Sequence, residues 1–487
     1  MALGTIDSLE FDTTLGATAK IIHISGDVYA IAYRGADNAG LLKTVSINSA
    51  GDIDSVLDTL IIDATYGTPG NIIHVSGDIY AIAYQGPDSV GWLATVEIDS
   101  AGDITDPVVD SQEFDILSGV SPRIIHISGT TYAITYAKAI GTGNKWRLWL
   151  KTISIADNGT IGAEVDSLEH DTGSPNALGS NIIHVSGDIY AIAHCSHIGG
   201  GWYRTCITTV DIDSVGNIAD AVVEKYEIAV DSYYPIRIGR IIHIAGVVYA
   251  VVAGVYSPNG VFLYTFDISN AGDVGAVIAS LEINLTHYQW SIPDIIKLPT
   301  DYAVACTDSG QYGRFKTIVI DDDGTIGEVT GILLFQVDKA HSPYMVSIAS
   351  GITGIVYSGP DSDGWMKTIG VTPTVTTQAV SDIIGITATG NGNITDLGAP
   401  NPTAHGVCYN TTGWPRITDD KTNEGAASEI GAFTTNMTEL VLGTSYYVRA
   451  YATNAAGTSY GNEVSFTTLV AIPSVISRAY ALSREEL

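Results

Sequence analysis

A recurring phrase constrains the fold of this chain more than any other feature. It reads IIHISGDVYAIAY from Ile21 and starts again at Ile72, Ile124, Ile182 and Ile241. Degenerate copies start at Ile295 and near Met345, which makes seven copies spaced roughly 50 to 60 residues apart. Repeats of this kind bury their apolar faces mainly against one another. The chain is therefore expected to fold as an array of similar units.

Each copy carries signals for four strands. The first strand is the Ile-Ile-His run, which ends at a glycine, and the second is an apolar and aromatic run that predicts burial on both faces. The third ends in a threonine that recurs in every copy: Thr44, Thr95, Thr152, Thr209, Thr265, Thr317 and Thr368. A turn follows in six copies, with glycine for a positive φ at Gly51, Gly102, Gly159, Gly216, Gly272 and Gly324. Four strands in a repeat of this length are typical of one blade of a β-propeller.

The seventh copy lacks its turn and its fourth strand, because a new composition begins at Val371. The missing strand is at the other end of the chain, where residues 4–12 read like the turn and fourth strand of residues 159–169. We therefore predict a seven-bladed β-propeller over residues 1–372, closed by the N-terminal strand. Closure of this kind removes the exposed edges of the sheets.

Strand-like runs of a different composition cover residues 373–468. Residues 440–452 combine a leucine-rich run, the Gly443-Thr444 turn and Tyr446, and Gly457 follows shortly after. This segment resembles the fibronectin type III family. The resemblance implies a β-sandwich in which the hydroxyl of Tyr446 bonds back to the backbone at a corner. Leu442 stands where that family often has proline, so an immunoglobulin-like sandwich is the alternative. The predicted fold class is all-β throughout.

Residues 469–487 are expected to form a linker and a short tail. Tyr480, Leu482 and Leu487 would share one apolar face of a short helix that docks on a neighbouring subunit, and a frayed terminus is the alternative. No run approaches the ~20 apolar residues that a membrane helix needs. No signal peptide is visible after Met1. We expect an extracellular or virion protein, which either leaves a cell by lysis or lacks its leader here.

The formal charge of −31, from 53 acidic and 22 basic residues, argues against nucleic acid or an anionic membrane as partner. Cys195 and Cys206 flank a predicted hairpin and are interpreted either as a disulfide or as two buried thiols, whereas Cys306 and Cys408 are expected to be unpaired. No cofactor is expected. The carboxylates of Asp321 and Asp323 meet part of a calcium-loop pattern, which leaves calcium as an alternative.

One histidine per copy stands on the first strand in five copies, at His23, His74, His126, His184 and His243. Rotational repetition puts equivalent side chains at separate places, whereas a metal site needs several ligands around one ion. We therefore expect these histidines to be bonded into the packing between blades, and we predict no metal site.

One set of loops breaks the symmetry of the repeats. The connections into blades five to seven and the starts of several third strands carry aromatic residues, which stack on sugar rings or anchor protein interfaces. The alternative is that these rings plug the face of the propeller. The predicted ligand-binding residues are Tyr233, Tyr234, Arg237, His287, Tyr288, Trp290, His341, Tyr344, Trp92, Trp202 and Trp365.

These features favour a non-catalytic structural or adhesive protein of an extracellular assembly, either a virion appendage or a microbial filament subunit. The expected partners are further copies of the chain, other structural proteins of the assembly, and glycans. A carbohydrate-binding propeller lectin is the alternative. A glycan hydrolase is a more distant one, since no arginine cluster and no nucleophile motif is visible. Glycosylation sequons occur at Asn158, Asn284, Asn393, Asn410 and Asn436.

Overall fold

The protein is described by a computed structural model that covers residues 2–139, 146–171, 180–200, 202–256, 259–288 and 291–470. The chain divides into two compact units, one of residues 7–369 and one of residues 1–6 with 370–487. In the described ranges, strands form both units and the only helices are three short turns, η1 (Ala36–Asn38), η2 (Pro87–Ser89) and η3 (Pro360–Ser362). None of the described helices has the length and apolar character to cross a membrane.

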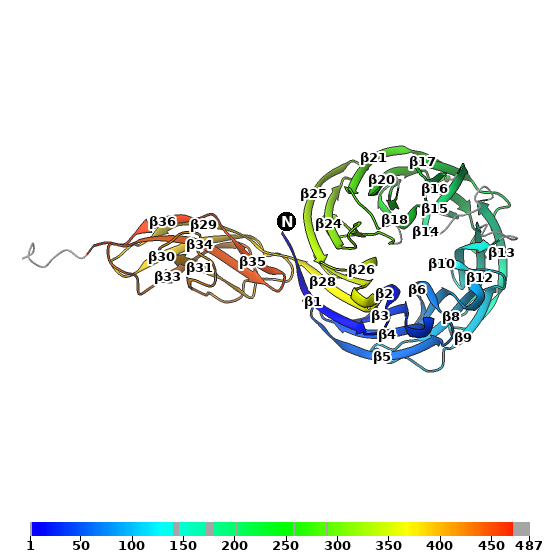
Figure 1. Cartoon of the computed structure of the whole chain (residues 1–487), viewed down its shortest axis with the longest axis horizontal. Helices are drawn as coiled ribbons and strands as arrows, with labels where there is room; N and C mark the ends of the chain where they lie inside the picture. Colours follow the sequence, from blue (N-terminus) through cyan, green and yellow to red (C-terminus); the bar gives the residue numbers. More distant parts are fainter. Residues whose placement is uncertain are drawn as a thin grey trace, which may run out of the picture. The chain divides into compact units, whose positions relative to one another are not determined.

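The first unit is a ring of four-stranded antiparallel sheets, each built from one copy of the repeat (Figure 1). The first blade contains β2 (Ala17–Ser25), β3 (Val28–Arg34), β4 (Gly40–Ile47) and β5 (Ile53–Asp63). The second contains β6 (Thr68–Ser76), β7 (Ile79–Gln85), β8 (Gly91–Glu97) and β9 (Asp110–Asp115). The third contains β10 (Val120–Ser128), β11 (Thr131–Ala139), β12 (Trp146–Ile155) and β13 (Ile161–Asp171).

The remaining blades follow the same order along the chain. The fourth contains β14 (Ser180–Ser186), β15 (Ile189–Gly199), β16 (Trp202–Asp211) and β17 (Glu224–Ser232). The fifth contains β18 (Arg237–Ala245), β19 (Val248–Val255), β20 (Gly260–Ile268) and β21 (Val274–Asn284). The sixth contains β22 (Asp294–Lys297), β23 (Tyr302–Thr307), β24 (Gly313–Ile320) and β25 (Ile326–Gln336).

The seventh blade confirms the predicted closure of the ring. Its sheet has the order β1-β28-β27-β26, so that β1 (Leu3–Asp12) is the outer strand beside β28 (Gly364–Val371), β27 (Ile352–Ser358) and β26 (His341–Ala349). Figure 1 shows β1, in dark blue, alongside β28, in yellow. The described part of the chain thus contains seven four-stranded sheets, as predicted.

The hydrophobic core lies between neighbouring blades. One cluster joins Ala32 and Leu42 of the first blade to Ile82 and Val96 of the second. The second strands are buried along nearly their whole length, as their composition predicts, because sheets cover both of their faces. Another cluster joins Met366 of the seventh blade to the first blade, so that the core runs across the point of closure.

Six of the seven recurring threonines join their blade to the next. The hydroxyl of Thr44 donates to the carbonyl of Gly102 at 2.6 Å, and Thr368 of the last blade donates to Gly51 of the first at 2.5 Å. The same bond recurs, at 2.6–2.7 Å, from Thr95, Thr152, Thr209 and Thr265 to Gly159, Gly216, Gly272 and Gly324. The acceptor glycines have φ between 87° and 99°, as the turn prediction requires.

A β-sandwich forms the second unit. One sheet contains β29 (Thr374–Ser381), β30 (Ala388–Asp396) and β33 (Gly431–Met437). The other contains β32 (Asp420–Lys421), β31 (Ala404–Asn410), β34 (Ser445–Asn454) and β35 (Gly457–Tyr460), and β36 (Val464–Thr467) pairs with β34. Met437, Val407 and Phe466 bring the two sheets together in one core. The hydroxyl of Tyr446 accepts a hydrogen bond from the N–H of Val441 at 3.0 Å, which is the corner bond implied by the resemblance. The tail residues Tyr480, Leu482 and Leu487 lie outside the described residues.

Candidate functional site

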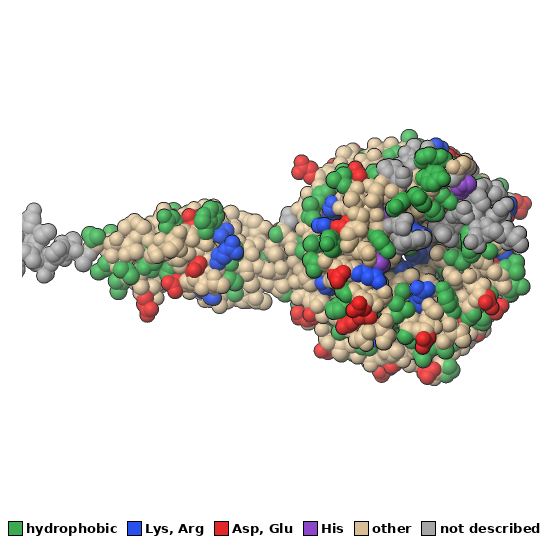
Figure 2. Space-filling model, in the orientation of Figure 1, with side chains coloured by type: hydrophobic (Ala, Val, Ile, Leu, Met, Phe, Trp, Pro, Cys, Tyr) green, Lys and Arg blue, Asp and Glu red, His purple; other side chains and the backbone are tan. Residues whose placement is uncertain are grey.

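An exposed group of aromatic side chains lies on the fourth and fifth blades. We call Trp202, Tyr233, Tyr234 and Tyr256 the aromatic surface; their exposed fractions are 43%, 54%, 44% and 37%. The rings contact each other edge to face in sequence, with centroid separations of 5.8, 5.5 and 4.6 Å. Figure 2 shows hydrophobic side chains gathered over this part of the ring. Exposed aromatic rings in mutual edge-to-face contact make this group a candidate binding surface.

Three of these four residues belong to the predicted set. Tyr256, which sequence reasoning missed, directly follows β19, a strand that is buried along its whole length. The sequence signal that could have identified it is an aromatic residue directly after a long apolar run. The loop between β19 and β20 lies on the same face as the loop that carries Tyr233 and Tyr234, because connections alternate between the two faces of a propeller sheet.

The structure does not bring the other predicted residues to the aromatic surface. Trp92 and Trp365 are half-buried and pack on Gly86 and Gly359 of their own loops. Tyr288 stacks on His341 with their centroids 4.3 Å apart. Trp92 and Trp365 therefore pack within their own loops, and Tyr288 and His341 pack on each other.

Two predicted residues are held in the interior near each other, and one is not described. His287 is buried, and burial lowers its pKa to about 4, with the nearby charge of half-buried Arg237 acting in the same direction. Neither side chain belongs to the aromatic surface. Trp290 lies outside the described residues.

The recurring histidines are structural, but their role differs from the predicted one. The Nε2 atom of His23 lies 2.8 Å from the carbonyl oxygen of Gly26, and its ring lies against Tyr29. The bond recurs at His74, His126, His184 and His243, at 2.8–2.9 Å. Each histidine therefore closes the turn of its own hairpin at the surface, and the prediction of bonds between blades is wrong. The reason is local, because the ring reaches the carbonyl three residues further along the chain.

The disulfide interpretation of Cys195 and Cys206 is wrong. Both are free, buried thiols, as are Cys306 and Cys408. Cys195 pairs with Thr205 across the hairpin and Cys206 with His194, so the two thiols belong to opposite faces of the sheet. Burial raises the pKa of both to about 12.

A second candidate site lies where the first strands begin, and of its members only Tyr344 was among the predicted residues. The residue before the Ile-Ile-His phrase is polar in every copy, and these residues gather at the centre of the propeller. We call them the channel ring: Lys20, Asn71, Arg123, Asn181, Arg240, Asp294 and Tyr344. Figure 2 shows Lys and Arg side chains, in blue, at the central hollow. These basic residues are far apart in sequence and meet only when the ring closes, so the cluster is not visible in the sequence.

The channel ring has two kinds of members. Asn71, Asn181 and Asp294, in even-numbered blades, accept a hydrogen bond from the backbone of the next blade, at Ile124, Ile241 and Met345. The first, third and fifth blades instead contribute Lys20, Arg123 and Arg240, and all three cations lie over the ring of Tyr344.

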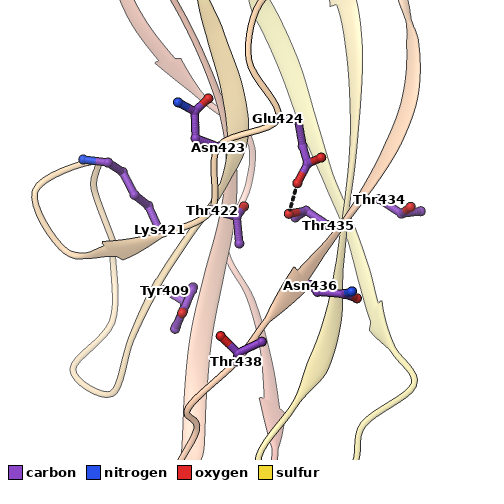
Figure 3. Close-up of a pocket in the computed structure, with 9 residues that line it drawn as sticks. All are labelled: Tyr409, Lys421, Thr422, Asn423, Glu424, Thr434, Thr435, Asn436 and Thr438. Carbon is purple, nitrogen blue, oxygen red and sulfur yellow. Dashed lines mark hydrogen bonds between the residues drawn. The ribbon is translucent and has the colours of Figure 1, made fainter.

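A polar groove in the β-sandwich is a third candidate (Figure 3). It has a volume of about 460 Å³ and runs between β33 and the segment that follows β32. Hydroxyl, amide and charged groups line it, and the Thr435 hydroxyl donates to Glu424 across it. Tyr409 is its only ring, and that ring is almost fully buried. The groove thus offers hydrogen bonds but no exposed aromatic platform.

The asparagines of the predicted glycosylation sites differ in their exposure. Asn158 and Asn436 are exposed, and Asn436 lines the sandwich groove. Asn284 and Asn410 are half-buried with their amides bonded to backbone, and Asn393 is half-buried.

Within the described ranges no group of three histidine, cysteine or acidic side chains could hold a metal ion. In the calcium-like turn, the carboxylate of Asp323 accepts a bond from the N–H of Thr325.

No protein-family model and no curated protein matches the sequence. Among solved structures, the chain is similar to a putative 6-phosphogluconolactonase from Bacteroides fragilis, with 13% identity, a TM-score of 0.46, and coverage of 66% of this chain and 85% of that one. It is also similar to the GH93 α-L-arabinofuranosidase of Fusarium graminearum, with 9% identity, a TM-score of 0.40, and coverage of 75% and 97%. A third structure, AofleA from Arthrobotrys oligospora, has 13% identity, a TM-score of 0.40, and coverage of 68% and 90%.

Proposed function

We propose that the chain is a non-catalytic adhesive protein, exposed outside the cell or on a virion, that binds a neutral glycan at the aromatic surface. The observation that carries the proposal is the sequence of four exposed, mutually contacting rings formed by Trp202, Tyr233, Tyr234 and Tyr256. Other large aromatic residues of the propeller repeat, such as Tyr29 and Tyr80, are buried.

The chemistry of the surface favours sugars over charged ligands. Aromatic faces carry negative charge density and attract the positive edges of C–H bonds, which line the faces of many sugar rings. Edge-to-face contacts within the aromatic surface leave ring faces free for such stacking. The charge of −31 repels polyanions, so an uncharged partner fits best. Strands β16 and β19 hold Trp202 and Tyr256 on a rigid scaffold, which reduces the entropy lost on binding.

A structural subunit is the second candidate, and a different observation favours it. One end of the β-sandwich exposes aliphatic side chains that lie close in the fold: Ile384, Ile386, Val441, Leu442, Leu469 and Val470. The N–H of Leu440 bonds to Ile386, and that of Gly443 bonds to Leu469, which brings these segments together. An exposed apolar patch of this kind is typical of a surface that contacts another protein.

A glycan array followed by titration of the best-bound glycan tests the proposal. We expect the parent protein to bind a neutral glycan, and Tyr234→Ala and Trp202→Ala each to weaken binding by about tenfold or more, equal to about 1.4 kcal/mol. Tyr312→Ala removes an equally exposed ring outside the aromatic surface and should leave the affinity unchanged.

Binding that survives both substitutions would place the glycan elsewhere. An array on which the parent binds nothing would remove the glycan proposal. In that case, sedimentation of the parent and of Leu442→Asp would test the structural subunit, which predicts association that the substitution abolishes.

A further inference from the structure

The channel ring contains more positive than negative charge. Lys20 Nζ lies 4.8 Å, Arg240 Cζ 4.5 Å and Arg123 Cζ 6.0 Å from the centroid of Tyr344. Asp294 is the one carboxylate of the ring, and it pairs with Arg240 at 3.0 Å. Three cations around one phenol ring, with a single acid, leave a local excess of positive charge in a protein that is otherwise strongly acidic.

Among the described residues, Lys20 and Arg123 hydrogen-bond to backbone carbonyls and form no direct ion pair, and the carboxylate of Asp294 acts on both from a greater distance. Lys20 is buried, and its ammonium donates to the carbonyls of Thr18 and Ala19 at 3.3 and 3.1 Å. Arg123 donates to the carbonyl of Gly70. Burial, and then the charge of Arg123, lowers the pKa of Lys20 well below its ordinary value. Buried cations are normally paired with an anion, because desolvation without a counter-charge is costly.

A small cavity adjoins these two cations. It has a volume of about 60 Å³, and hydroxyl-bearing Thr68 and Ser121 line it together with Lys20 and Arg123. The buried hydroxyl of Thr68 has no protein hydrogen-bond partner. Buried polar groups are rarely left without a partner, so this hydroxyl points to a bound species. A cavity of this volume holds a few water molecules or one small ion, and it is too small for a sugar ring.

The backbone around the cavity is held in an unusual conformation. Thr18, Ser121 and Ser342 stand two residues before Lys20, Arg123 and Tyr344, and their φ values are 55°, 51° and 49°. The strand register shifts at the same places, between Ala17 and Lys20 and at the equivalent positions of the third and seventh blades. Such bulges re-aim side chains, and positive φ at non-glycine residues is unfavourable and persists only where the surrounding structure enforces it.

We propose that the channel ring binds one small inorganic anion, of chloride to phosphate size, between Lys20, Arg123 and the hydroxyl of Thr68. The anion supplies the direct counter-ion that Lys20 and Arg123 lack, because Asp294 pairs directly with Arg240, and it accepts the hydrogen bond that Thr68 has free. It is a structural ligand that joins first strands of the first, second and third blades. This site is separate from the aromatic surface and does not depend on glycan binding.

Thermal unfolding at fixed ionic strength tests the site. The reference salt is sodium gluconate, because the gluconate anion is too bulky for the cavity. We expect chloride or phosphate to raise the Tm of the full chain by a few degrees over gluconate, because a ligand that binds only the folded state stabilises it. Lys20→Met and Thr68→Val should lose most of that increment. In gluconate, Lys20→Met should unfold at or above the parent's Tm, because it removes one of the crowded like charges. Arg147→Met, which removes an exposed cation paired with Glu169, is the matched control and should keep the full increment.

An identical Tm for the parent in gluconate, chloride and phosphate would overturn the proposal, as would an unchanged increment in both Lys20→Met and Thr68→Val. Crystals of the parent grown in bromide give a test that requires no variant to fold. An anomalous peak beside Lys20 Nζ and Arg123 supports the site, and a channel ring without such a peak contradicts it.

Discussion

At the scale of single residues, a threonine hydroxyl joins six of the seven blades to the next one, and the sixth blade is the exception. Thr317 of the sixth blade bonds with Thr330 of its own blade at 2.8 Å, whereas its equivalents bond to a glycine of the next blade. The next blade is the seventh, which has no turn between its third and fourth strands because β1 comes from the other end of the chain. The threonine therefore recurs even where its partner is missing.

This exception gives a matched pair of substitutions. Thr152→Val keeps the side-chain shape but leaves the buried carbonyl of Gly216 without its donor, and we expect a loss of about 1–2 kcal/mol in the free energy of unfolding. Thr317→Val, which breaks no bond between blades, should cost clearly less. Urea unfolding of both variants measures the difference. Equal costs would show that the bond between blades contributes nothing specific.

At the scale of elements, β1 takes the place of a fourth strand in its contacts as well as in its position. Phe11 packs edge to face on Tyr33, and the Tyr33 hydroxyl donates to Asp12 at 2.6 Å. In an uninterrupted part of the chain, Phe114 of β9 packs on Tyr136 in the same way, and Tyr136 donates to Asp115 at 2.8 Å. The terminal strand thus makes the same contacts with the next blade as an internal one.

We expect Phe11→Ala to cost about 3–5 kcal/mol, close to the cost of Phe114→Ala, because both rings are buried between blades. Chemical denaturation of the two variants under one set of conditions provides the comparison. A cost below ~1 kcal/mol for Phe11→Ala alone would mean that the ring remains stable without β1.

At the scale of the whole molecule, part of the acidity is structural. The carboxylates of Asp7, Asp58, Asp110 and Asp166 each accept a hydrogen bond, at 2.8 Å, from a backbone N–H of the following blade, at Ile53, Ile104, Ile161 and Ile218.

The interior of the propeller also holds neutral histidines. Burial lowers the pKa of His194 to about 4, and its ring bonds to Thr208 at 2.8 Å. Burial likewise lowers the pKa of His170 well below its ordinary value.

These histidines make the molecule sensitive to acid. Below pH 6.5 an unfolded histidine takes up a proton that buried His194 does not, so stability falls as the pH falls from 6.5 towards 4. The expected slope is up to about 1.4 kcal/mol per pH unit for each such group. His194→Gln, which keeps a hydrogen-bonding side chain, should flatten the profile of unfolding midpoint against pH in this window. The exposed His126→Gln is the control. Superimposable profiles for the parent and His194→Gln would contradict the assignment.

The sequence was sufficient to predict the ring. Periodicity determined the number of blades, the order of strands within each blade and the place of the N-terminal strand, because every copy must present the same faces to its neighbours. The glycines at the turns, such as Gly102, followed from the positive φ that those turns require. Tyr446 followed from the resemblance of its surrounding segment.

Only the tertiary structure decided which side chains come together to form the candidate sites. Trp202, Tyr234 and Tyr256 form one surface, whereas Trp92 and Trp365, near the starts of the third strands of other blades, fill their own loops. Loop conformation decides this, and no repeat dictates it. Lys20, Arg123 and Arg240 meet around Tyr344 only because the ring closes. The repeat determines that this position is polar and faces the centre, but the residue there changes from blade to blade. The charge at the centre is the sum over residues more than a hundred positions apart in sequence, so it exists only in the folded ring.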